Sequence, residues 1–263
     1  MTATDAPVSE QQIAVTGKQI RIRQDGAGDQ VVVLHHSTGS VGWIELSERL
    51  AQSFAVAAPD LPGWGQSDRP EWARDPRDIA ILMNRMLDRL DISDVTLVGL
   101  GFGGFIAAEM ATMSQVRLKA MVLVGAAGLQ PDEGEITDQT FLSLDGYVQA
   151  GYHDEARFKE HYGEEIDSSL EELWSFSREM TYRVTWEPYM FSRRLPHLLT
   201  EVEVPTLLIW GEHDGIVPLI CAQQYQRALQ NAKLEVVPDA GHLVEMEQPA
   251  MVAELIRTHV NGL

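Results

Sequence analysis

The chain has 263 residues, a formal net charge of −19 at pH 7 and 44% hydrophobic residues. This length suits one large α/β domain, with or without an inserted subdomain, and the composition is that of an ordinary globular protein. The acidic balance argues against a nucleic-acid partner and against an anionic membrane surface, because both are bound through basic side chains. The longest apolar runs are too short to span a bilayer.

The N-terminus and the cysteine content predict a cellular location. The stretch "MTATDAPVSEQQ" lacks the basic start and the apolar region of a secretory signal. Cys221 is the single cysteine, so an internal disulfide is excluded and a reducing compartment is favoured. We therefore expect a cytoplasmic protein, and the sequence leaves a homodimer open.

Predicted strands and helices alternate through the first half of the chain. A hairpin that turns at Thr16-Gly17 is followed by a strand at 30–36, a helix at 41–53, a strand at 54–58, a helix at 75–92, a strand at 95–100, a helix at 103–113 and a strand at 117–126. Such alternation predicts a mostly parallel, doubly wound sheet with helices on both sides.

The alternation stops near residue 128. Residues 129–200 contain no clear strand and at least three amphipathic helices, whereas strands and helices alternate again from 204 to 260. We therefore predict an α/β core formed by 1–128 and 201–263, with a helical lid inserted at 129–200 that covers one end of the sheet. No internal repeat and no low-complexity segment is present.

Polar loops follow the predicted strands, and in an open parallel sheet these loops meet at one rim where ligands bind. In chain order they are "HHSTGS" at 35–40, "DLPGWGQSD" at 60–68, the turn around Gly101, "GEHDGIVP" with Asp214, and "DAGHLVEMEQP" with His242. Together with "VGLGFGGFIAAEMA", these motifs resemble the α/β-hydrolase superfamily, and among its lidded members the meta-cleavage-product hydrolases.

The resemblance implies a role for each matching residue. Asp214 matches the acid that orients the histidine, and His242 matches the general base. Backbone N–H groups of Ser37 and Phe102 match the oxyanion hole. Asp60 and Ser67 are expected to stabilise their glycine-rich loop rather than contact a substrate.

The sequence departs from the family pattern at three positions. Gly101 replaces the nucleophile, Leu100 stands where a histidine is common, and His36 replaces a usual glycine. Covalent catalysis at position 101 is excluded, and we expect the nucleophile position to be vacant, with room for a water molecule. Three departures together favour natural divergence over an engineered knock-out.

Other sites that these residues could form are less favoured. His35 and His36 are adjacent, so on an extended chain their side chains point to opposite faces and do not share a metal. "GLGFGG" resembles a dinucleotide fingerprint, but it opens no N-terminal βαβ unit and lacks the later acidic residue. We therefore expect neither metal nor cofactor. Ser37 or Thr38 as a relocated nucleophile remains a weaker alternative.

The lid is rich in aromatic residues, which suits an apolar or aromatic small molecule. We predict substrate contacts from His36, Trp174, Trp186, Tyr189 and Leu243. Arg183, Arg193 and Arg194 pair either with a substrate anion or with neighbouring acids.

Three functions fit this sequence. The first is a non-covalent hydrolase in which a His–Asp base activates water or takes a substrate proton. The second is a cofactor-free lyase, oxygenase or isomerase that uses the same base. The third is an inactive small-molecule-binding protein that has kept the fold.

Overall fold

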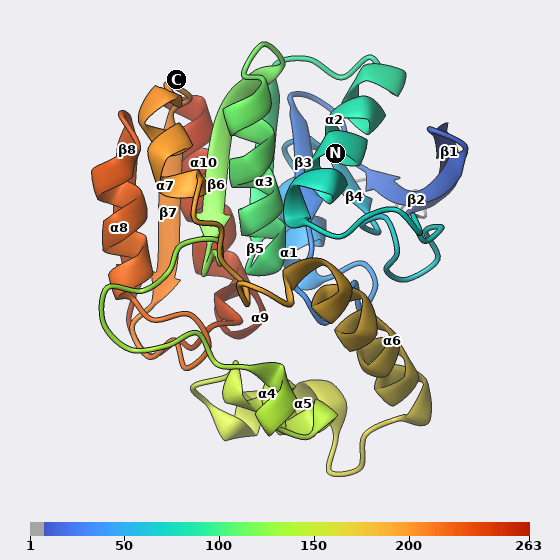
Figure 1. Cartoon of the computed structure of the whole chain (residues 1–263), viewed down its shortest axis with the longest axis vertical. Coiled ribbons are helices and arrows are strands. Elements are labelled where there is room, and N and C mark those ends of the chain that lie inside the picture. Colours follow the sequence, from blue (N-terminus) through green and yellow to red (C-terminus); the bar gives the residue numbers. More distant parts are fainter. Residues whose placement is uncertain (1–7) are drawn as a thin grey trace, which may run out of the picture.

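The structure, a computed structural model, describes residues 8–263. Most of the N-terminal stretch considered for a signal lies outside these residues. Eight strands form one sheet in the order β1-β2-β4-β3-β5-β6-β7-β8 (Figure 1). The pairs β1–β2 and β2–β4 are antiparallel and the remaining pairs are parallel. The predicted mostly parallel α/β sheet is confirmed.

The strands lie where the apolar runs predict them. Their bounds are β1 Ser9–Val15, β2 Lys18–Asp25, β3 Gln30–Leu34, β4 Ala55–Pro59, β5 Val95–Leu100, β6 Leu118–Val124, β7 Thr206–Gly211 and β8 Ala232–Val237. Every residue of β5 and of β7 is buried, as expected for central strands covered on both faces. Thr16 and Gly17 turn the β1–β2 hairpin with φ of 49° and 79°, the left-handed values that a tight hairpin turn requires.

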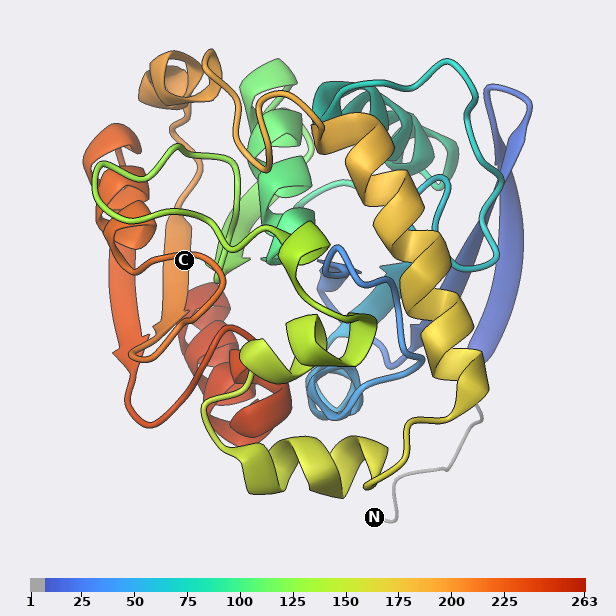
Figure 2. The same cartoon turned by 60° about the horizontal axis from the view of Figure 1, so that its bottom comes forward.

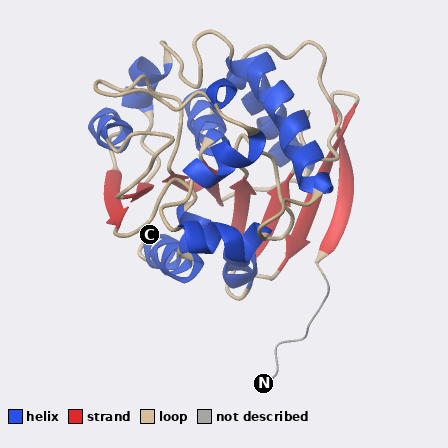
Figure 3. Ribbon diagram, turned by 90° about the horizontal axis from the view of Figure 1, so that it is seen from below, coloured by secondary structure: helices blue, strands red, loops and turns tan. Residues whose placement is uncertain are grey.

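Helices cover both faces of the sheet. Helices α2 (Pro76–Arg89), α3 (Phe102–Met113) and α8 (Ile220–Ala228) pack on one face, while α1 (Glu45–Ala51) and α10 (Pro249–Asn261) pack on the other. Figure 3 shows the strands in a row between these two layers. A short helix that the sequence did not predict, α9 (Val244–Glu247), directly follows His242.

The chain between β6 and β7 contains helices and no named strand. They are η1 Gln139–Phe141, α4 Leu144–Ala150, α5 Glu155–Tyr162, α6 Ser168–Thr185, α7 Leu195–Leu198 and η2 Leu199–Glu201. The side chains of Ser143, Asp154 and Asp167 cap α4, α5 and α6, which explains where these three helices begin. We call residues 129–200 the helical segment. Helices α4, α5 and α6 lie below the sheet in Figure 1 and come forward in Figure 2, whereas α7 lies beside the sheet.

Backbone contacts join the helical segment to the loops at this end of the sheet. The amide of Leu243 donates to the carbonyl of Gly151 at 2.9 Å, and the Thr181 hydroxyl donates to the carbonyl of Ser37 at 3.0 Å. The segment therefore contacts the loops that follow β3 and β8. Within residues 8–263, no helix has both the length and the apolar character needed to cross a membrane.

Candidate active site

Asp214 and His242 come together from the loops that follow β7 and β8. The Asp214 Oδ2 atom lies 2.9 Å from Nδ1 of His242. The other carboxylate oxygen accepts the amides of Ile216 and Val217 at 2.9 and 2.8 Å. Because Nδ1 faces a carboxylate, it carries the proton, which leaves the lone pair of neutral His242 on Nε2. This is the arrangement of an oriented general base.

The buried His242 ring contacts the loop that follows β6 as well as Asp214 in the loop that follows β7. A Cβ on Gly125, whose φ is +54°, would come within 3.0 Å of the imidazole Nδ1, so the ring packs directly on this glycine. Burial opposes the charged form, but the Asp214 carboxylate outweighs burial and raises the pKa of His242 above its usual value. The ring is therefore a stronger base than a free imidazole.

The turn between β5 and α3 has the geometry expected of a nucleophile elbow. Gly101 has φ 51° and ψ −109°, which a glycine adopts with little strain. Gly103 allows the turn to pack against the carbonyl of Leu34, which a Cβ at that position would approach to 2.2 Å. The elbow predicted from "VGLGFGG" is thus present in its backbone.

The space above Gly101 is not open. A Cβ placed on Gly101 would lie 2.3 Å from Nδ1 of His36 and 2.9 Å from Nε2 of His242. Position 101 therefore has no nucleophile, and a side chain there would not fit without a shift of His36. The water expected beside His242 stays a prediction. The His36 ring, present where the family pattern has a glycine, fills the space that a serine side chain would need.

Glu245 holds His36 in this position. Its Oε1 lies 3.0 Å from Nε2 of His36, and both side chains are buried. The rings of His36 and His242 meet edge to face, with centroids 5.0 Å apart. Among the described residues, Oε2 of Glu245 has no hydrogen-bond partner. Two histidine–carboxylate pairs therefore face each other over Gly101.

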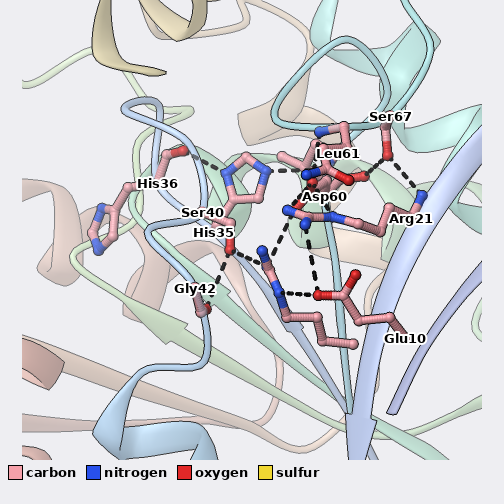
Figure 4. A network of polar contacts seen from close by, with 11 residues as sticks. Glu10, Arg21, His35, His36, Ser40, Gly42, Asp60, Leu61 and Ser67 are labelled. Atoms are coloured by element: carbon pink, nitrogen blue, oxygen red, sulfur yellow. Dashed lines mark hydrogen bonds and ion pairs between the residues drawn. The ribbon is translucent and has the colours of Figure 1, made fainter. Parts of the chain in front are cut away.

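The neighbouring His35 has a structural role. Its Nδ1 donates to the carbonyl of His36 at 2.7 Å, and its Nε2 accepts the amide of Leu61 at 2.9 Å. Burial lowers the pKa of His35 to about 4, which keeps the ring neutral. Figure 4 shows the two adjacent rings pointing to opposite sides of the chain, as the sequence predicts.

The same view shows a polar network beneath the loop that follows β4. Asp60 accepts from the guanidinium group of Arg21 at 2.7 Å and from the Gln66 amide at 2.8 Å (Figure 4). The Ser67 hydroxyl donates to the carbonyl of Asp60 at 2.7 Å. Asp60 and Ser67 thus stabilise their own loop, as predicted.

The peptide groups on both sides of Ser37 are fixed. The carbonyl of His36 accepts from His35 and from the Gly39 amide, and the carbonyl of Ser37 accepts from the Trp64 indole at 3.2 Å. Phe102 begins α3, so its N–H belongs to the unpaired first turn. Within the part of the chain that the structure describes, neither the Ser37 nor the Phe102 N–H has a protein acceptor.

The sequence did not single out two residues of this site. Glu245 lies in the quoted motif "DAGHLVEMEQP", and the only signal was its place three residues after His242, next to an unusual histidine at position 36. Tyr147 of α4 is buried near the Ser37 hydroxyl and the Asp214 carboxylate, and burial raises its pKa to about 12.

An apolar pocket adjoins His36 and Glu245. Both side chains line it, together with Val33, Ile44, Leu100, Val148, Leu243 and Met246. The pocket lies between the loop after β3, α1, α9 and the helical segment. His36 therefore borders both this pocket and the ring of His242, and Leu243, predicted to bind substrate, also lines the pocket.

The other predicted substrate contacts lie elsewhere. Trp174 is buried and packs on Tyr162 within the helical segment. Tyr189 stacks on Tyr182, and its hydroxyl accepts the amide of Gln139 at 3.2 Å. Trp186 is 70% exposed at a surface groove, because it follows the last turn of α6 on the outer side. The structure does not bring Trp186 to the site.

The three arginines predicted to pair with a substrate anion or with acids have contacts elsewhere. Arg194 pairs with Asp75 at 2.7 Å, and Arg183 donates to the carbonyl of Glu71 at 2.6 Å. Arg193 lines the same outer groove as Trp186. Cys221 is buried in α8, where burial raises the pKa of its thiol to about 12.

One group of side chains on the surface has metal-ligand character. Donor atoms of His153, His213 and Asp239 lie within 4.8 Å of one another, and all three residues are exposed. The two imidazoles stack with centroids 4.0 Å apart. His35 and His36, the pair considered from the sequence, do not share a ligand position.

Comparisons with known proteins find relatives that match most of the chain. The chain is 27% identical to the 2-hydroxymuconate semialdehyde hydrolase of Pseudomonas sp. strain CF600 over 272 residues, which cover 96% of this chain and 94% of the relative. It is also 26% identical to an uncharacterized protein of Mycobacterium tuberculosis, over 95% of this chain and 81% of the relative.

Solved structures share the fold at low identity. A meta-cleavage product hydrolase from Pseudomonas fluorescens superposes with a TM-score of 0.79 at 24% identity, covering 97% of this chain and 98% of that one. A bacterial membrane phospholipase A superposes with a TM-score of 0.83 at 20% identity, covering 97% and 86%.

The family assignment follows from the sequence itself. Residues 31–255 match the model of the alpha/beta hydrolase family, and this range contains Gly101, Asp214 and His242. The chain therefore belongs to the alpha/beta hydrolase family.

Proposed function

We propose that this protein hydrolyses a small apolar or aromatic substrate without forming a covalent intermediate. In this reaction His242 removes a proton from water, and the resulting hydroxide attacks the substrate carbonyl. Asp214 orients the ring and stabilises its protonated form. The observation that carries the proposal is the buried Asp214–His242 hydrogen bond, with Nε2 directed over a residue that has no nucleophile.

An oxyanion hole of backbone N–H groups supports hydrolysis. We place the developing negative charge between the N–H groups of Ser37 and Phe102, whose peptide groups are held by neighbouring hydrogen bonds and by the start of α3. Preorganised donors of this kind lower the barrier because they need no reorientation during the reaction. Such a site retains roughly 10³–10⁴-fold catalysis over water even without a complete triad.

The helical segment acts as the lid in this proposal. Val148, Tyr162 and Leu243 give the pocket beside His36 an apolar lining, which favours an apolar acyl or aromatic group over a charged one. The name of the Pseudomonas relative, a semialdehyde hydrolase, is compatible with a carbonyl substrate. A cytoplasmic location and a small-molecule partner remain part of the proposal.

The test combines a variant with a covalent probe. We expect His242→Ala to abolish hydrolysis of aryl acetates, because water at this site then has no base. A fluorophosphonate should leave the intact mass of the wild-type protein unchanged. Labelling of Ser37 or Thr38 would contradict a non-covalent mechanism. Unchanged turnover in His242→Ala would contradict the role of His242.

The alternative of an inactive binding protein gives a different result. A binder would return a bound metabolite chemically unaltered, and His242→Ala would change only its affinity. The buried Asp214–His242 pair favours the enzyme, since a binding protein gains little from desolvating such a pair.

A further inference from the structure

We propose that His36, positioned by Glu245, is a second proton-transfer residue of this site and serves as the general acid for the leaving group. The inference rests on the proposed hydrolase function and adds the residue that such a reaction needs. Nothing in the resemblance to the family assigns this role, because the family pattern has a glycine at this position.

The first argument is the geometry of the two rings. His36 Nδ1 and His242 Nε2 lie 2.3 and 2.9 Å from one point, the place where a Cβ on residue 101 would stand. Each ring directs its other nitrogen to a buried carboxylate, His36 to Glu245 and His242 to Asp214, at 3.0 and 2.9 Å. Both reactive nitrogens thus face the same small volume.

The second argument is charge. Two imidazoles this close repel each other when both are protonated, so the doubly protonated state of the pair is disfavoured. A neutral ring accepts a proton and a protonated ring donates one. The pair therefore supplies a base and an acid to the same substrate at the same time.

The third argument is access. His36 and Glu245 line the apolar pocket, and the His36 ring also meets the His242 ring edge to face. A substrate in the pocket meets His36 directly. The free Oε2 of Glu245 leaves this carboxylate able to stabilise the charged form of His36.

The resulting reaction balances in atoms and charge. A bond forms between the water oxygen and the carbonyl carbon as the C=O π pair moves onto the carbonyl oxygen, while one water proton moves to Nε2 of His242. The π bond then re-forms as the bond from this carbon to the leaving atom breaks; its electron pair stays with the leaving atom, and that atom takes the proton of His36 Nδ1. Proton exchange between the two facing rings restores the starting state, and no redox partner is needed.

The role of His36 is tested with acetate esters whose leaving groups differ in basicity. A nitrophenolate leaves without protonation, whereas an alkoxide needs an acid. We expect His36→Asn to lower the rate on an alkyl acetate by about 10²-fold or more relative to the rate on 4-nitrophenyl acetate. Glu245→Gln should change the ratio of the two rates in the same direction but by less. Equal losses on both esters would overturn the proposal.

A matched control separates this effect from loss of a buried carboxylate. Glu109 of α3 is buried and pairs with Arg77, and among the described residues no hydrogen bond or ion pair joins it to His36 or His242. Glu109→Gln should leave the ratio of the two rates unchanged. His242→Ala separates the two proposals, since it should abolish hydrolysis of both esters whether or not His36 is the acid.

A second measurement does not depend on turnover. We expect nuclear magnetic resonance of histidine-labelled protein to show the proton of neutral His36 on Nε2, and the two rings taking up their protons in separate steps. The groups facing His36 are Glu245 from α9, His242 with Asp214 behind it, His35 from its own loop, and Tyr162 from α5. Protonation of both rings in a single step that Glu245→Gln does not change would overturn the proposal. This measurement applies even if no ester is hydrolysed.

Discussion

The loops after β7 and β8 differ from the loops after β3 and β5. The first two carry Asp214 and His242 in the arrangement that the family resemblance predicts. The other two depart from the family pattern in complementary ways, since residue 101 has no side chain and the His36 ring occupies the space that one would need. The change at position 101 is therefore best understood as one half of an exchange with position 36.

Replacing the orienting acid tests the conserved half of the site and should give the largest effect. We expect Asp214→Asn to lower kcat by roughly 10³–10⁴-fold, because the histidine loses its preferred tautomer. Asp214 also raises the pKa of His242, so the acid limb of the pH–rate profile should move to lower pH in the variant. A profile that stays in place would show that another group controls the acid limb.

Restoring the serine tests the changed half. Gly101→Ser alone should react poorly with a fluorophosphonate, because the new Cβ would collide with His36. Gly101→Ser combined with His36→Gly should react at least about tenfold faster, at a rate set by the Asp214–His242 pair. Rapid labelling of Gly101→Ser alone would contradict a steric clash between residues 36 and 101.

His35 tests whether adjacent histidines have separate roles. Burial lowers its pKa to about 4, so the unfolded chain binds more protons than the folded one between about pH 6.5 and pH 4. The stability that depends on neutral His35 is complete above pH 6.5 and falls by about 1.4 kcal/mol per pH unit as the pH decreases through this window. Denaturant titrations of wild type and His35→Gln should show a smaller pH dependence in the variant.

The smallest effect is expected at Gly125, which packs against His242. Gly125→Ala places a side chain at a φ of +54°, which costs about 1–2 kcal/mol in unfolding free energy. The new methyl group would also lie 3.0 Å from Nδ1 of the His242 ring and displace it, so we expect a decrease in kcat with little change in KM. Unchanged stability and activity in this variant would show that the loop after β6 can shift to accommodate the methyl group without strain.

Much of this architecture could be predicted from the chain alone. The alternating apolar runs and the Thr16-Gly17 turn are local signals, so the strands and helices of the core fall close to their predicted places. The position of Asp214 beside His242 follows from the rule that parallel strands bring their ends to one rim.

The occupant of the space above Gly101 could not be predicted in this way. It depends on a side chain 65 positions away and on a carboxylate from α9, a short helix with no periodic signal. The predicted substrate contact of Trp186 is wrong for a related reason. Its aromatic character favours burial, but it does not determine whether the residue that ends α6 faces the site or the solvent. Tertiary packing, rather than local pattern, decides both.

The carboxylate of Glu247 gives the site a mechanical property. It accepts the amide of Gly241 at 2.6 Å and the amides of His153 and Asp154 at 2.9 and 2.8 Å, so one side chain ties the start of α5 to the residue before His242. A movement of the segment at the start of α5 would therefore also move His242. We expect the start of α5 to stay in place during the catalytic cycle, and the ligand to enter and leave beside α6.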